Sequence, residues 1–234
     1  MRLLIVGHGR MGQLIEGLAP DYGFEVAGIL EIDSNPDGSG VTADRCRDVD
    51  VAIDFSTAEA TLATVPRLAA AGVSLVVGTT GWTDREAELR EAVEHSGVGA
   101  VVAANFSLGA NLTNALAATM GRLLRDTETY GAWIHEAHHK AKRDAPSGTA
   151  LMLQRALEGV GYRQPVDVSS TRAGSVPGTH TVGFDGPAES LTLTHTVRDR
   201  ATFAHGALEA ARWVSGRKGW YTMQDVLGLG PTAS

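Results

Sequence analysis

A glycine-rich turn near the start of the chain places the strongest constraint on the fold. The apolar run 3–6 leads into Gly7-His8-Gly9-Arg10-Met11-Gly12, and a helical pattern follows it. Glycines between a buried strand and a helix allow a tight turn and let a pyrophosphate approach the helix amides. The sequence therefore predicts a dinucleotide site of the Rossmann type. Its phosphate contacts are expected from Gly7, Gly9, Arg10, Met11 and Gly12.

Glu31 follows the second predicted strand, at the place where such units carry an acid for the adenosine ribose hydroxyls. The alternative is a polar strand end that binds nothing. Ile32 and Asp33 come next, so no cation adjoins Glu31 to receive the 2′-phosphate of NADPH. The pattern favours NADH over NADPH, although Arg45 or Arg47 could fold back toward the ribose.

Strand and helix patterns continue to alternate after Glu31. Strands are predicted over 51–55, 75–77 and 99–104, and capping boxes at 56–59 and 83–86 are expected to open two of the helices. Alternation of this kind predicts an α/β fold with a doubly wound parallel sheet.

Ligands of such sheets gather where the strands end. Two small-residue segments lie at strand ends, and each could also be an ordinary turn. They are expected to flank the nicotinamide end of the cofactor, through Gly78, Thr79, Thr80, Ala103, Ala104, Asn105 and Phe106.

The pattern changes after residue 107. A helix over 112–124 precedes strands that are typical of a largely antiparallel α+β sheet. These strands are predicted over 127–137, 166–172, 179–184 and 190–197. We therefore predict a dinucleotide-binding domain over 1–106 and 202–234, and a second domain over 107–201.

Cationic side chains and a helix start fall together in the stretch 136–150. Pro146 disfavours helical angles before it and Ser147 is a good N-cap, so a helix is predicted to begin near Gly148. The amides of Gly148 and Thr149, which have no partners within the helix, would suit a carboxylate or a phosphate. The adjacent histidines and Lys142 could hold a small dianion and pass protons to it.

Two other readings of this stretch remain open. His135, His138 and His139 with Asp144 could ligate a metal, but the neighbouring lysines and arginine disfavour a dication, so no metal is predicted. A solvated basic loop is the second alternative, and it is the commoner case for any lone Lys or His.

Composition limits the kinds of partner that the protein is expected to bind. The formal net charge of -7 argues against nucleic acid or an anionic membrane, and no apolar run approaches the length of a membrane span. The single cysteine, Cys46, cannot form an internal disulfide, which suits a reducing cytoplasm.

The run His138-His139-x-x-Lys142-x-Asp144-Ala-Pro-Ser-Gly-Thr149-Ala resembles the signature of the 4-hydroxy-tetrahydrodipicolinate reductase (dihydrodipicolinate reductase) family. Gly-Thr-Thr-Gly at 78–81, Ala-Asn-Phe-Ser at 104–107 and the closing segment 219–227 are also similar to this family. The resemblance implies that His138 donates a proton and that Lys142 is a second donor or a charge clamp. It makes His139, Gly148 and Thr149 contacts to the substrate.

The resemblance also implies a reaction. It is the reduction of a ring dicarboxylate by NADH or NADPH, with loss of its 4-hydroxyl as water, in lysine and diaminopimelate biosynthesis. A homotetramer built through the sheets of the second domain is the implied assembly. The rival functions are another amino-acid dehydrogenase, of the aspartate or homoserine type, and a non-catalytic NAD-binding sensor. Arg172 and Arg200 are read as surface residues and are left out of the site.

Overall fold

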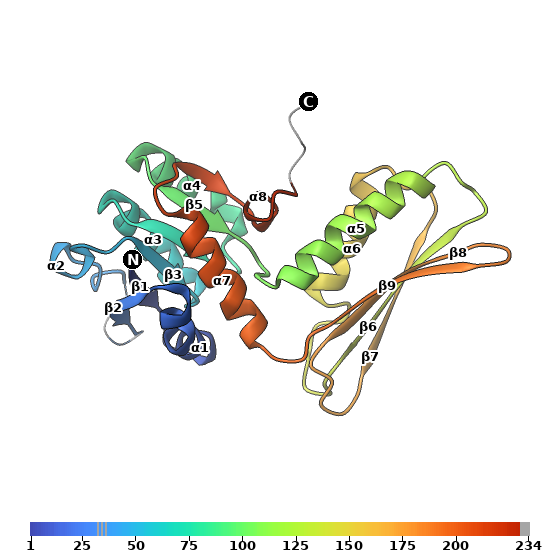
Figure 1. The fold of residues 1–234 in the computed structure, drawn as a ribbon, viewed down its shortest axis with the longest axis horizontal. Coiled ribbons are helices and arrows are strands. Elements are labelled where there is room, and N and C mark those ends of the chain that lie inside the picture. Colours follow the sequence, from blue (N-terminus) through green and yellow to red (C-terminus); the bar gives the residue numbers. More distant parts are fainter. Residues whose placement is uncertain (32, 34, 36, 230–234) are drawn as a thin grey trace. The chain divides into compact units, whose positions relative to one another are not determined.

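The computed structural model describes residues 1–229 with the exception of 32, 34 and 36. The chain divides into two compact units, residues 1–107 with 201–234 and residues 108–200 (Figure 1). No helix among the described residues combines the length and the apolar character needed to cross a membrane.

A six-stranded parallel sheet with the order β10-β5-β4-β3-β1-β2 forms the centre of the first unit. This confirms the predicted doubly wound sheet. Five of its strands lie where the sequence predicts them, within two residues at either end. They are β1 (Arg2–Val6), β2 (Glu25–Leu30), β3 (Val51–Asp54), β4 (Ser74–Val77) and β5 (Gly99–Val102). The sixth, β10 (Gly219–Tyr221), pairs with β5 and is not predicted as a strand by the sequence pattern.

Helices cover both faces of this sheet. Successive residues of each strand point to opposite faces, so one strand contributes side chains to two apolar clusters. Leu3 and Ile5 of β1 belong to one apolar cluster, together with residues of α1 (Arg10–Leu18) and α7 (Ala201–Val214). Leu4 and Val6 belong to a second cluster, with residues of α3 (Ala58–Ala70) and α4 (Glu86–Ser96). The near-continuous apolar strands are thus explained by burial on both sides.

Both predicted capping boxes are wrong in detail. The N-cap of α3 is Thr57, whose hydroxyl accepts a hydrogen bond from the amide of Ala60, while the Ser56 hydroxyl donates to Asp54 instead. A 3₁₀ turn over Thr83–Arg85 precedes α4, and that helix has no side-chain cap. A further short helix, α2 (Ala43–Cys46), lies between β2 and β3.

The second unit consists of a four-stranded sheet with two helices on one face (Figure 1). Its strand order is β7-β6-β8-β9; β6 pairs antiparallel with β8, as β8 does with β9, whereas β6 and β7 are parallel. The elements are α5 (Leu108–Leu124), β6 (Gly131–His138), α6 (Gly148–Gly159), β7 (Val166–Arg172), β8 (Thr179–Asp185) and β9 (Ser190–Thr196). The core lies between the helices and the sheet, and includes Ala117, Ile134, Leu153, Val182 and Phe184.

Two glycines in helices of the first unit give a matched stability test. A Cβ added to Gly206 of α7 would lie 1.8 Å from the carbonyl oxygen of Phe106, whereas one added to Gly17 of α1 would meet nothing within 4 Å. Gly206→Ala should therefore lower the free energy of unfolding by about 2 kcal/mol or more. Gly17→Ala should raise it by about 0.5–1 kcal/mol. Denaturant unfolding followed by circular dichroism measures both, and equal stability of the two variants would contradict this packing.

Candidate active site

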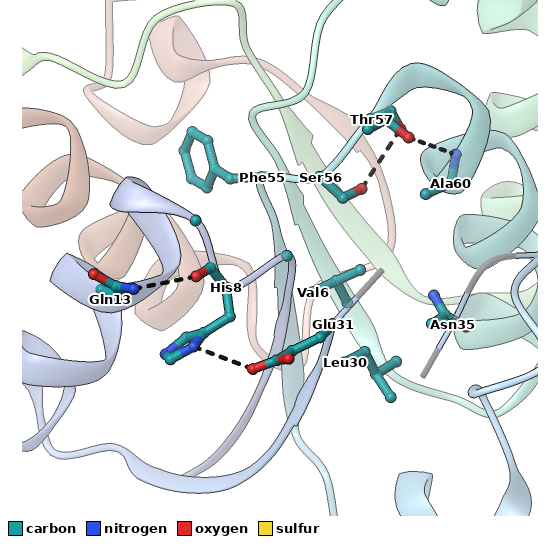
Figure 2. A pocket seen from close by; sticks show the side chains of 12 residues that line it. Val6, His8, Gln13, Leu30, Glu31, Asn35, Phe55, Ser56, Thr57 and Ala60 are labelled. Carbon is teal, nitrogen blue, oxygen red and sulfur yellow. Dashed lines mark hydrogen bonds and ion pairs between the residues drawn. The ribbon is translucent and has the colours of Figure 1, made fainter. Parts of the chain in front are cut away.

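A pocket of about 480 Å³ opens at the carboxyl end of the first unit's sheet (Figure 2). Of the residues predicted to bind the cofactor, Gly7, Gly9 and Glu31 line it. The lining also includes residues that the sequence did not single out, among them His8, Gln13, Asn35, Phe55, Ser56 and Thr57. The segment after β3 therefore contributes as much to this pocket as the glycine-rich turn does.

The glycines of the first turn fit a dinucleotide phosphate. Gly7 has φ +87°, and an added Cβ would lie 2.6 Å from the carbonyl oxygen of Phe55. A Cβ on Gly12 would lie 2.1 Å from the carbonyl oxygen of Gly7, so this glycine allows the helix to pack on the turn. Gly9, the N-cap of α1, has open space above it. A pyrophosphate can thus approach the positive end of the helix directly.

His8 and Glu31 point toward one another in the pocket (Figure 2). His8 Nδ1 lies 3.5 Å from Glu31 Oε1, and its Nε2 lies 2.7 Å from Glu16 Oε2. Ile32, on which the NADH prediction partly rests, is outside the described residues. Arg45 and Arg47 line a separate hollow beside β1 and β2.

Asp54 is fully buried at the end of β3 and is hydrogen-bonded to the chain segments around the pocket. Its carboxylate accepts hydrogen bonds from the Ser56 amide at 2.8 Å, from the Thr79 hydroxyl at 3.0 Å and from the Thr61 hydroxyl at 2.9 Å. Burial raises the pKa of Asp54, and these donors oppose the shift. One carboxylate therefore fixes the chain after β3 and the chain after β4.

The other predicted cofactor segments follow β4, which lies next to β3 in the sheet, and β5, which lies next to β4. Gly78 packs on the ring of Phe55, and that ring meets Phe106 edge-on at 5.8 Å. The side chain of Asn105 accepts from the Ser107 amide at 2.8 Å. Ala103 is half-buried; Thr80 and Ala104 are exposed. On α1, Arg10 is exposed and Met11 packs against the core.

In the second unit, the predicted helix start is confirmed. The Ser147 hydroxyl caps α6 by accepting from the Ala150 amide at 3.2 Å, and the helix begins at Gly148. Gly148 is exposed and Thr149 is half-buried. The first turn of α6 thus presents its amide end where an anion can reach it.

A buried cluster surrounds His138 at the end of β6. Glu136 has no exposed surface and accepts a hydrogen bond from Nδ1 of His138. Arg172, the partner of His138 on β7, donates to both oxygens of Glu136, at 2.8 and 2.6 Å. The Ser147 amide donates to Glu136 at 3.2 Å. Glu136 therefore connects two strands and the start of α6.

Burial and hydrogen bonding together set the pKa values in this cluster. Burial alone would raise the pKa of Glu136, but the hydrogen bonds from Arg172, Ser170 and His138 outweigh it and lower the pKa to about 2. Burial lowers the pKa of His138, and Glu136 opposes that shift. His180, whose ring meets that of His138 at 5.0 Å, has its pKa lowered to about 4, chiefly by burial.

The remaining predicted residues lie on the turn after β6. Lys142 is ion-paired with Asp144, with 2.8 Å between Nζ and Oδ1, and this bond lowers the pKa of the Asp144 carboxyl. His139 is half-buried, and its carbonyl accepts from the Lys142 amide at 3.1 Å. Because Lys142 lowers the pKa of both His138 and His180, its charge acts on the buried cluster.

Glu136, His138 and His180 also have the donor types of a metal site, and their ligand atoms lie within 4.8 Å of one another. However, Arg172 donates to both oxygens of Glu136. A dication would have to displace this guanidinium, so the donor set fits proton transfer better than metal binding.

Sequence reasoning missed Glu136, Arg172, His180 and Asp54. Arg172 was read as a surface residue, yet its side chain is only 18% exposed. The Glu-x-His spacing on a predicted strand was a usable signal for Glu136, since alternate residues share a face. The pairing of β6 with β7 and β8, which brings in Arg172 and His180, has no signal in the local sequence.

The parallel sheet and its glycine-lined pocket define a Rossmann-type protein that binds a nicotinamide dinucleotide. Family models agree: "Dihydrodipicolinate reductase, N-terminus" matches residues 1–106, and "Dihydrodipicolinate reductase, C-terminus" matches residues 109–227. The chain belongs to the dihydrodipicolinate reductase family.

Relatives and a solved structure are similar over nearly the whole chain. A 4-hydroxy-tetrahydrodipicolinate reductase of Laribacter hongkongensis is 40% identical over 98% of each chain, and one of Methanoregula boonei is 39% identical over 96% of each. The dipicolinate-bound dihydrodipicolinate reductase of Paenisporosarcina sp. TG-14 shares the fold, with a TM-score of 0.80 and 22% identity, over 96% of this chain and 98% of that one.

Proposed function

We propose that this protein reduces 4-hydroxy-tetrahydrodipicolinate to tetrahydrodipicolinate with NADH or NADPH, in lysine and diaminopimelate biosynthesis. The observation that carries the proposal is the His138 cluster beside the amide end of α6, within a chain of this family. A proton donor and an anion-binding helix end are what a ring dicarboxylate undergoing reduction requires.

The first unit is the dinucleotide-binding domain of this proposal. Gly7, Gly9, Arg10, Met11 and Gly12 contact the phosphates, and Glu31 binds the ribose. The nicotinamide end lies against Gly78, Thr79, Thr80, Ala103, Ala104, Asn105 and Phe106. When bound, the cofactor supplies a hydride to the ring.

The second unit binds the substrate. Gly148 and Thr149 hold one carboxylate and His139 contacts the ring. His138 supplies the proton that balances the hydride, so that a C–H bond replaces the C–O bond and the hydroxyl leaves as water. Lys142 clamps a carboxylate or donates a second proton, after exchanging its partner Asp144 for the substrate.

The charge of the substrate makes His138 a usable acid. Burial lowers the pKa of His138 in the free protein and so favours the neutral imidazole. A bound dicarboxylate adds negative charge beside it and so raises that pKa. Protonation of His138 is therefore coupled to substrate binding.

We further propose a cytoplasmic homotetramer. The sheet face turned away from α5 and α6 presents hydroxyl side chains, hydrogen-bonded across β8 and β9 as Thr179–Thr196 at 3.1 Å and Thr181–Thr194 at 3.0 Å. Such a polar, partly exposed sheet face suits contact with a second copy. Cys46, the single cysteine, is buried and fits a reducing compartment.

Two rival functions predict different results. Another amino-acid dehydrogenase would not need the His138, His139 and Lys142 run. A non-catalytic NAD-binding sensor would bind the dinucleotide without turnover, and it would have no need of an acid at His138. The substrate assay separates all three.

Turnover of the proposed substrate is the first prediction of this assignment. Oxidation of NADH with the product of dihydrodipicolinate synthase should be rapid, and aspartate semialdehyde should give no oxidation.

His138→Gln should lower kcat by about 100-fold or more with little change in dinucleotide affinity, because general acid catalysis typically contributes that much. Lys142→Ala should lower kcat and weaken substrate binding. An unchanged rate in His138→Gln would remove the acid assignment, and inactivity of the native protein on both substrates would favour the sensor.

Cofactor preference is a separate prediction. Glu31 would repel a 2′-phosphate, so the KM for NADH should be below that for NADPH. Glu31→Gln should bring the two KM values closer together, because it should raise the KM for NADH and lower the KM for NADPH. Steady-state kinetics with both cofactors measures this, and Glu16→Gln, which alters the other carboxylate beside His8, serves as the control. A lower KM for NADPH in the native protein would overturn the preference.

A further inference from the structure

Glu136 has no part in the roles above, yet it is the most enclosed charge of the second unit. It lies two residues before His138 on β6, on the same face of the sheet, and has no exposed surface. Its hydrogen-bond partners are all donors: the His138 ring, the Arg172 guanidinium, the Ser147 amide and Ser170. Leaving such a carboxylate without partners would be costly, so the arrangement around it is strongly specified.

We infer that Glu136 is a positioning residue that holds His138 by Nδ1 and leaves Nε2 as the atom that exchanges the proton. This inference rests on the proposed function, in which His138 is the acid. Because Nδ1 keeps its hydrogen bond to Glu136, the neutral imidazole carries its proton on Nδ1. The proton delivered to substrate is then the second one, taken up and released at Nε2.

Arg172 keeps Glu136 anionic, so Glu136 does not take the proton from the His138 ring. Its guanidinium donates to both carboxylate oxygens and, at 2.5 Å, to the carbonyl of Asp144. This bidentate pair contributes most to the low pKa of Glu136 against the effect of burial. A carboxyl with a pKa of about 2 does not compete with an imidazole for a proton at neutral pH.

The charges that face His138 from the neighbouring elements would disfavour its protonation if Glu136 were not there to oppose them. Lys142 on the turn after β6 and Arg172 on β7 are cationic and lower the pKa of His138, while His180 on β8, with its pKa lowered to about 4, is neutral at pH 7. His195 on β9 lies opposite His180, and Asp144 is paired with Lys142. Glu136 raises the pKa of His138 and so opposes both burial and the two cations.

A purely structural role makes a different prediction. If Glu136 only joined β6 to β7, neutralising it would lower stability and leave the titration of His138 unchanged. Tyr162→Phe provides the matched control, because it removes a hydrogen bond of 2.7 Å to the Tyr130 carbonyl in the same unit without touching the cluster.

The direct test is ¹⁵N NMR of the histidine rings in the full-length protein, with the His138 signals assigned by their loss in His138→Gln. In the native protein, neutral His138 should carry its proton on Nδ1. In Glu136→Gln, the pKa of His138 should fall by about 1 or more, and Glu136→Asp should restore part of it. Tyr162→Phe should titrate as the native protein does. A native His138 protonated on Nε2 would overturn the inference whether or not any variant folds.

The pH profile of turnover gives the second readout. The protonated form of His138 is the acid, so kcat/KM falls as pH rises through its pKa. Loss of the Glu136 charge lowers that pKa and moves the falling limb to lower pH. If the pKa falls by about 1, kcat/KM above the pKa should fall about tenfold. The KM for NADH should not change. A native profile in Glu136→Gln would contradict the inference, whereas the NMR result without turnover in the native protein would contradict only the proposed reaction.

Discussion

The bonding of one buried carboxylate organises the second unit. Glu136 has no access to water, so each of its oxygens must receive donors from the protein. Those donors come from three places: His138 on β6, Arg172 on the neighbouring strand β7, and the Ser147 amide before α6. Because the Glu136 carboxylate bonds to both the His138 ring and the Ser147 amide, His138 lies next to the N-terminal end of α6. The geometry needed for chemistry follows from the need to pair a charge.

The first unit uses the same device. Asp54 is equally buried at the end of β3, and its donors come from the segments after β3 and β4 and from α3. Thr79 is fixed from a second side as well, because its carbonyl accepts from the Trp82 indole at 2.8 Å. A rigid strand-end scaffold holds a ligand more precisely than free loops would. In each unit a carboxylate that binds no ligand in the proposed mechanism orders the residues that do.

Local sequence patterns predicted most elements of the fold but not the contacts between them. The glycine-rich turn, the apolar strands and the Pro146-Ser147 helix start each have a chemical cause within a few residues, and the structure confirms them. Strand β10 and the pairing that joins Arg172 to Glu136 depend on partners distant in the chain, where periodicity carries no information. The roles of His138, Lys142 and the cofactor residues remain predictions, since geometry alone does not measure them.

The central claim is that the start of α6 and the Glu136-held imidazole form one site for a dicarboxylate. Titration of the ¹⁵N-labelled protein with pyridine-2,6-dicarboxylate tests it most directly. We predict saturable shifts of the Gly148 and Thr149 amides together with a rise in the pKa of His138, and a much weaker response to pyridine-2-carboxylate. Saturable binding that leaves the Gly148 and Thr149 amides and the His138 titration unchanged, or no binding at all, would contradict the account.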